Sequence, residues 1–258
     1  MDEVLDSMRQ ALGERYRIDG EIGRGGMAVV YHADEPRRER EVAIKVLDSS
    51  VRSVLGRKRF LREVSVLSGL SHPHIVPILS AGQADGLLYY VMPFIDGETV
   101  LHRIRSDGRL PVSEAVLYAK EVADALAFAH DRGVVHRDIK PENVLLSNGH
   151  AVVADFGIAR MLSDVGGDTL TQTGLVVGSP LYMSPEQAAG RREIDGRADI
   201  YALGRVLHEM VTGRLPDAAV ERGALDVPQE CAKALAGALA DDREERFRSA
   251  AEFAAALD

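Results

Sequence analysis

A glycine-rich segment near the N-terminus could bind a phosphate group. It contains Gly23, Gly25 and Gly26 and lies between two β-branched runs that predict strands. Glycine lets backbone amides approach a phosphate closely because no Cβ is in the way. A hairpin turn that only needs positive φ would explain the same glycines. A Rossmann site is disfavoured, because Val29 and Val30 follow where that site needs a helix.

A single lysine, Lys45, lies inside the apolar run 42–46, which predicts a strand. A buried ammonium group without a partner is costly, so we expect a carboxylate beside it. Glu63 is the best placed, because it lies on a predicted helix with one apolar face. That pair would leave the ammonium group to hold nucleotide phosphates. A surface lysine at a strand edge is the alternative reading.

The densest group of chemically capable residues lies between residues 134 and 157. Its residues are His136, Arg137, Asp138, Lys140, Pro141 and Asn143 and, after a predicted hairpin, Asp155, Phe156 and Gly157. Asp155 lies seventeen positions beyond Asp138. This set and its spacing resemble the catalytic core of eukaryotic-like (Hanks-type) bacterial Ser/Thr protein kinases, and the resemblance covers residues 16–257. It also explains the glycine-rich segment and Lys45.

The resemblance implies a role for each of these residues in phosphoryl transfer from ATP. Asp138 would accept or orient the proton of the substrate hydroxyl, and Lys140 would offset charge on the migrating group. Asn143 and Asp155 would supply oxygen ligands for Mg²⁺, with Mn²⁺ as an expected substitute. The residues expected to bind ATP are Ile22, Gly23, Gly25, Gly26, Val30, Ala43, Lys45, Glu63, Met92 and Leu145.

The resemblance also implies how the catalytic segment is supported. His136 and Phe156 would stack with Leu67 and Ile78 in an apolar column, which Asp199 would anchor. Asp199 lies at the start of a predicted helix, so a simple helix cap is a compatible role for it.

Residues 155–186 resemble an activation segment, since they form a long polar stretch. Thr171 and Thr173 are the expected phosphorylation sites, and a phosphate there would pair with Arg137. At the end of the segment, Glu186 is expected to pair with Arg246. Lys140 together with a hydroxyl residue at position 179 is typical of kinases that act on serine and threonine.

The sequence departs from the family pattern in three places. Ala28 stands where a third loop glycine is common, and Pro93 follows Met92 where a glutamate is frequent. Only 32 residues separate Gly213 from Arg246. We therefore expect the substrate-docking helix of this region to be absent or reduced to about one turn.

The resemblance implies an α+β, bilobal kinase fold, and the elements that must position these residues agree with it. A small β-rich N-lobe with one helix is expected over 16–95 and a larger, mainly helical C-lobe over 96–258, after an N-terminal extension over 1–15. Apolar runs with turn signals at their ends predict the strands, and 3.6-residue periodicity predicts the helices. Strands are expected over 15–23, 28–34, 41–47, 75–82 and 87–94, and helices over 56–70, 112–133, 198–213, 230–240 and 249–257.

Composition limits the partners and the location. The 258 residues carry a net charge of −9, which disfavours nucleic acid as a partner. One cysteine, Cys231, and no apolar run long enough for a signal peptide or a membrane span favour a cytoplasmic protein. Protein substrates and self-association for autophosphorylation are the expected interactions. The competing hypothesis is a pseudokinase, a nucleotide-binding module without transfer activity.

Overall fold

The computed structural model describes residues 3–26, 28–48, 56–156, 180–191, 193–216 and 227–258. It divides into two compact units. The first contains the described parts of Met1–Ser71 and Val76–Ile95, and the second contains His72–Ile75 and the described parts of Asp96–Arg160 and Gly174–Asp258.

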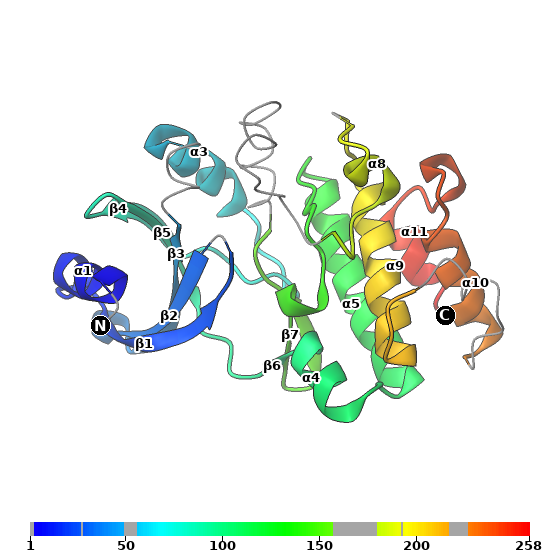
Figure 1. Cartoon of the computed structure of the whole chain (residues 1–258), viewed down its shortest axis with the longest axis horizontal. Helices are drawn as coiled ribbons and strands as arrows, with labels where there is room; N and C mark the ends of the chain where they lie inside the picture. The colour runs from blue at the N-terminus through cyan, green and yellow to red at the C-terminus, as the bar shows by residue number, and fades with distance from the viewer. Residues whose placement is uncertain (1–2, 27, 49–55, 157–179, 192, 217–226) are drawn as a thin grey trace. The chain divides into compact units, whose positions relative to one another are not determined.

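The first unit contains a five-stranded antiparallel sheet in the order β1-β2-β3-β5-β4 (Figure 1). A short 3-10 helix, Pro36–Arg38, connects β2 to β3. The strands are β1 Arg17–Arg24, β2 Ala28–Glu35, β3 Arg40–Leu47, β4 Ser80–Ala84 and β5 Leu87–Pro93, and the helices are α1 Glu3–Leu12 and α3 Arg57–Leu67.

One face of this sheet forms a hydrophobic core. Tyr31, Ile44 and Val91 are paired in register across β2, β3 and β5, and all three are fully buried. Met8 of α1 is buried in the same cluster. Because side chains alternate between the two faces of a strand, Lys45 lies on the opposite face from this core.

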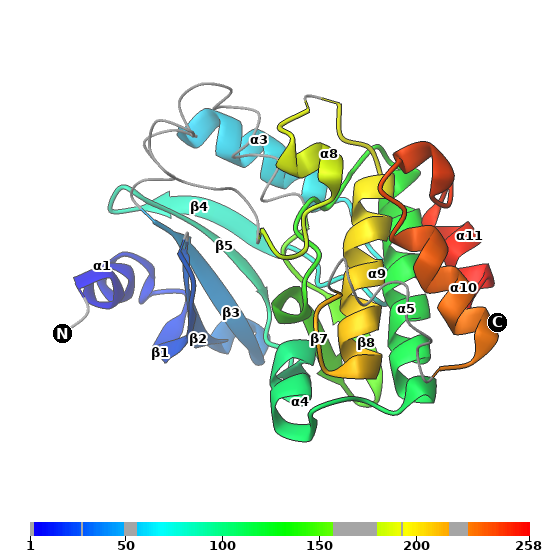
Figure 2. The same ribbon diagram turned by 45° about the vertical axis from the view of Figure 1, so that its right-hand side comes forward.

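The second unit is mainly helical, and its two longest helices, α5 and α9, lie side by side in Figures 1 and 2. Nine of the 19 residues of α5 and twelve of the 16 residues of α9 are buried, so both belong to the core. The helices are α4 Val100–Asp107, α5 Val112–His130, α8 Pro185–Ala188, α9 Arg197–Thr212, α10 Gln229–Ala238 and α11 Ala250–Ala255.

A small antiparallel sheet in the second unit carries the segment of chemical interest. Its strand order is β6-β7-β8, and the 3-10 helix η2 directly precedes β7. The bounds are β6 Glu98–Thr99, η2 Pro141–Asn143, β7 Val144–Ser147 and β8 His150–Val153. The hairpin expected between Asn143 and Asp155 is therefore confirmed.

The predicted elements are present, with one shifted strand. The strand expected over 75–82 begins only at Ser80, because Ile75 instead forms a parallel bridge with Val153 of β8. Pro77 also lacks the N–H group that a ladder needs. Helices α1, α4 and α8 were not predicted. Among the described residues, no helix is long and apolar enough to cross a membrane.

Candidate active site

Four of the residues expected to bind ATP share one face of the first unit's sheet. Val30 pairs with Lys45 across β2 and β3, and Ala43 pairs with Met92 across β3 and β5. Residues in register across strands, or two apart on one strand, point to the same side. The sheet therefore presents Val30, Ala43, Lys45 and Met92 together, on the side opposite the core.

The glycine-rich segment connects β1 to β2 at the end of this face. Gly23 pairs with Val30 after a register shift, and the Gly25 amide donates to the Ala28 carbonyl at 2.9 Å. Gly25 and Gly26 are exposed, and Ile22 is 50% exposed. The turn thus has its amides near the surface, where a phosphate could reach them.

Glu63 lies on α3, between the buried residues Phe60 and Val64. It is half-buried, as is Lys45 on β3. Both residues belong to the first unit, and their expected ion pair stays a prediction.

In the second unit, Asp138 is held by two of the residues that the sequence singled out. The ammonium group of Lys140 lies 2.9 Å from Oδ2 of Asp138. The side-chain amide of Asn143 donates to the Asp138 carbonyl at 2.8 Å and to Oδ2 at 3.3 Å. Asp138 and Lys140 are each 20% exposed, so the carboxylate is positioned yet accessible.

Asp155 is connected to the same group through the backbone. The Ala154 amide donates to the Asn143 carbonyl at 2.9 Å, which fixes the end of β8 beside η2. Asp155 has φ 64°, a left-handed conformation that is uncommon for aspartate and costs about 1–3 kcal/mol. That conformation must be maintained by the surrounding structure.

The donor set of this region fits Mg²⁺. The amide nitrogen of Asn143 is used as a donor to Asp138, so its amide oxygen is the atom suited to a cation. Asp155 offers a carboxylate. No cluster of three or more His, Cys, Asp or Glu side chains able to hold a metal is found in the described part of the chain. Two oxygen side chains suit Mg²⁺, which usually keeps water and phosphate ligands.

The rings of His136 and Phe156 are in contact, as expected, but they meet edge-on, with ring centroids 4.7 Å apart. The Asp138 amide donates to Nδ1 of His136 at 3.2 Å, and Nε2 of His136 lies 2.9 Å from the Ala154 carbonyl. The ring therefore accepts at Nδ1 and donates at Nε2, as a neutral imidazole does. The His136 ring thus connects Asp138 to Ala154, the residue before Asp155. Leu67 and Ile78 belong to the first unit, and their part in the column stays a prediction.

Asp199, at the start of α9, binds three donors. Its carboxylate accepts from the amides of His136 at 2.8 Å and Arg137 at 2.7 Å, and from the His130 ring at 2.8 Å. Burial opposes ionisation of Asp199. The hydrogen bond from His130 and the electrostatic attraction to the same ring outweigh burial, so the pKa of Asp199 lies below its ordinary value. Arg137 has φ 69°, and Asp199 holds this strained residue.

His130 was not predicted from the sequence. It is the last residue of α5, and its contact with Asp199 becomes visible only when α5 and α9 pack together. A histidine at a helix end carries no sequence signal that distinguishes this role from surface exposure.

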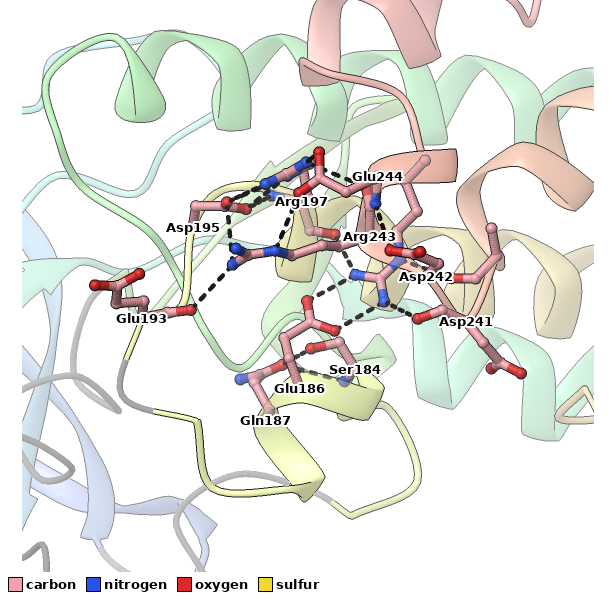
Figure 3. Close-up of polar contacts among 12 residues, drawn as sticks. Ser184, Glu186, Gln187, Glu193, Asp195, Arg197, Asp241, Asp242, Arg243 and Glu244 are labelled. Atoms are coloured by element: carbon pink, nitrogen blue, oxygen red, sulfur yellow. Dashed lines mark hydrogen bonds and ion pairs between the residues drawn. The ribbon is translucent and has the colours of Figure 1, made fainter.

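Glu186, which Figure 3 labels, forms with Arg246 the ion pair expected from the sequence. Two parallel hydrogen bonds of 2.7 and 2.8 Å join them, and both side chains are buried. Burial alone would raise the pKa of Glu186, but the hydrogen bonds from Arg246 hold it below the ordinary value. The guanidinium group also donates to the carbonyls of Ala240 and Asp241.

A second residue of α8, Gln187, was not singled out from the sequence. Its amide oxygen accepts from the Ser184 amide at 3.2 Å, and its nitrogen donates to the Arg137 carbonyl at 2.9 Å. The sequence does contain a signal for this role of Gln187, because a serine followed three residues later by a glutamine is the pattern of a capping box. α8 therefore supports the residue that precedes Asp138.

Leu145 is half-buried on β7, where it pairs with Val152. Thr171, Thr173 and residue 179 lie outside the described residues.

With this geometry established, comparison with known proteins identifies the family. Residues 16–251 match the model of the protein kinase domain. The chain belongs to this family.

Its curated relatives include Ser/Thr protein kinases of bacteria. PknB of Mycolicibacterium smegmatis is 38% identical over 96% of the chain and 43% of the relative. PknJ of Mycobacterium tuberculosis is 41% identical over 93% of the chain and 44% of the relative. The chain thus spans less than half the length of these relatives.

A solved structure shows the same fold. The crystal structure of the Mycobacterium tuberculosis PknI kinase domain aligns with a TM-score of 0.73 and 32% identity, over 94% of each chain. The α+β, bilobal kinase fold predicted from the sequence is confirmed.

Proposed function

We propose that this chain is the catalytic domain of a protein kinase that transfers the γ-phosphate of ATP to serine and threonine hydroxyls of proteins. The observation that carries the proposal is the arrangement around Asp138. Its carboxylate has Lys140 at 2.9 Å and the Asn143 amide at 3.3 Å, and Asn143 is joined by its backbone to the segment that bears Asp155. A base, a cation and two metal ligands are the groups that phosphoryl transfer requires.

Each residue has a distinct task in this proposal. Asp138 orients the attacking hydroxyl and accepts its proton, while Lys140 neutralises charge that develops on the transferred group. Lys45 and the amides of the glycine-rich turn hold the phosphates. The other residues of the proposed ATP-binding set are Ile22, Val30, Ala43, Met92 and Leu145, and Glu63 orients Lys45.

Asn143 and Asp155 would hold Mg²⁺ through their side-chain oxygens, and Mn²⁺ could replace it. The metal ion, when bound, supplies positive charge that offsets the phosphate oxygens.

Regulation and partners extend the proposal. Phosphorylation of Thr171 or Thr173, by the kinase itself or by a second copy, would create an anion for Arg137 to bind. Protein substrates are the expected partners, and ATP as donor fits a cytoplasmic site of action. Domain bounds of 16–95 and 96–258 for the two lobes are part of the same proposal.

Phosphoamino-acid analysis of a generic protein substrate, incubated with ATP and Mg²⁺, tests the function. We expect phosphoserine or phosphothreonine from the wild type and at least a ~100-fold lower rate from Asp138→Asn and from Lys45→Met. Circular dichroism checks that each variant is folded. A wild type that binds nucleotide but transfers no phosphate above the Asp138→Asn background would indicate a pseudokinase instead.

A further inference from the structure

β1, the strand that leads into the glycine-rich turn, contains an irregularity at Asp19. Ile18 pairs with Ala33 and Gly20 with His32, so Asp19 is an additional residue on β1. Such a bulge turns a side chain away from the direction that regular pleating would give it. The bulge lies only three residues before Ile22.

Arg9 of α1 holds the backbone of this bulge. Its Nε donates to the Ile18 carbonyl at 3.0 Å, and its Nη2 donates to the Asp19 carbonyl at 2.6 Å. β1 is an edge strand, so one side of it has no neighbouring strand to occupy its carbonyls. One guanidinium group thus attaches α1 to two consecutive residues of β1.

His32 of β2 holds the side chain of the same bulge. Its Nδ1 lies 2.9 Å from the Asp19 carboxylate, and its Nε2 lies 3.2 Å from the Glu41 carboxylate on β3. Its ring also meets Phe94 edge-on, at a centroid distance of 4.7 Å. A single ring therefore links β1, β2, β3 and the residue that follows β5.

His32 lies on the face proposed to bind ATP. It is two residues from Val30 on β2 and pairs with Ala43 on β3, so its side chain shares their side of the sheet. Nothing in the chemistry of phosphoryl transfer requires a histidine at this position.

We propose that Arg9 and His32 are positioning residues that fix the β1 bulge and thereby the glycine-rich turn, and that protonation of His32 tightens nucleotide binding. This inference rests on the proposed kinase function.

The pH dependence follows from the two hydrogen bonds of His32. The His32 ring can donate a hydrogen bond to both carboxylates at once only if both ring nitrogens carry a proton, which is the imidazolium form. The titratable groups that face the ring are Asp19 from β1 and Glu41 from β3; Phe94 does not titrate. Histidine commonly changes charge between pH 5 and 8. One of the two bonds is lost as the pH rises, so the contribution of His32 is largest in acid.

The test is the dissociation constant of a fluorescent ATP analogue with Mg²⁺, measured between pH 6.0 and 8.5. Relative to wild type, His32→Leu should weaken binding about fivefold at pH 6.0, the scale of one hydrogen bond, and at most about twofold at pH 8.5. Asp19→Ala, at an exposed position, should show the same trend without threatening the fold. Arg9→Met should weaken binding about fivefold at every pH, because arginine stays charged.

Arg17→Ala is the matched control, because the Arg17 side chain also links β1 to β2, but through Asp34 and not through Asp19. It should leave the dissociation constant unchanged. Amide hydrogen exchange of residues 20–24 in the nucleotide-free protein gives an independent readout, which should be faster in His32→Leu and Arg9→Met than in the control.

Equal affinities of wild type, Asp19→Ala and Arg9→Met at pH 6.0, or a His32→Leu effect that does not vary with pH, would overturn the inference. A wild type that binds no nucleotide would instead overturn the proposed function.

Discussion

Asp199 is the residue on which the conformation of the catalytic segment depends. Its two oxygens accept from three donors, and an ionised carboxylate is an acceptor only. Asp199→Asn would turn an NH₂ group toward at least one of these donors. We expect a loss of about 2–3 kcal/mol of folding free energy, measured by urea unfolding, and a fall in kcat. An unchanged kcat would contradict the role assigned to Asp199.

The same carboxylate predicts how stability responds to acid. Its folded-state pKa lies below the ordinary value of 3.8, so its contribution is present above that pH and is lost as the pH falls through the folded-state pKa. The difference in unfolding free energy between wild type and Asp199→Asn should therefore be constant from pH 7 to 5 and shrink below pH ~4. If the difference in unfolding free energy between the two proteins grew as the pH fell, this prediction would be wrong.

Residues that belong to a linear motif could be predicted, whereas residues that act across elements could not. Asp138, Lys140, Asn143 and Asp155 are recognisable from spacing alone. His130 and His32 act through partners that are 69 and 13 positions away in the sequence. Neither residue type nor periodicity indicates such a partner, because packing decides it.

At the scale of elements, the Glu186–Arg246 pair attaches α8 to the loop after α10. Breaking a buried pair leaves a charge without compensation, so Arg246→Met should cost about 3–5 kcal/mol in urea unfolding. Adding Glu186→Gln to that variant should recover part of the loss. The matched control is Arg243→Ala, since Arg243 contacts Asp195 and Glu244 near the surface and should contribute less than ~1 kcal/mol.

Element boundaries were predictable where one periodicity dominates. α5 and α9 match their expected ranges within three residues at each end. α1 was missed, because an N-terminal stretch with several charges does not show that Met8 will be buried against a sheet. The shift of β4 has a similar cause, since the partner of Ile75 is far along the chain.

At the scale of the whole molecule, the first prediction concerns regulation. Thr171→Ala/Thr173→Ala should slow phosphoryl transfer, because no phosphate would then be available to pair with Arg137. Intact-mass spectrometry, paired with rate measurements, checks the phosphorylation state. An unmodified enzyme with full activity would refute this form of regulation.

The second prediction concerns substrate docking. Residues 217–226 lie outside the described part of the chain, and the expectation of a reduced docking helix there stays a prediction. Alanine substitutions across 217–222 should affect phosphorylation of a protein and of its short peptide equally. A selective loss with the intact protein would show that this region docks substrates after all.

Residues 72–75 have a consequence for synthesis of the chain on the ribosome. They belong to the second unit although both flanking segments belong to the first, and Ile75 pairs with Val153. At 5–20 residues per second, Val153 is made roughly 4–16 s after Ile75. During that interval the connection from α3 to β4 lacks its strand partner. The connection between two segments of the first unit therefore stays without this partner until β8 has been made, so a chaperone that shields it would have to act before β8 has emerged.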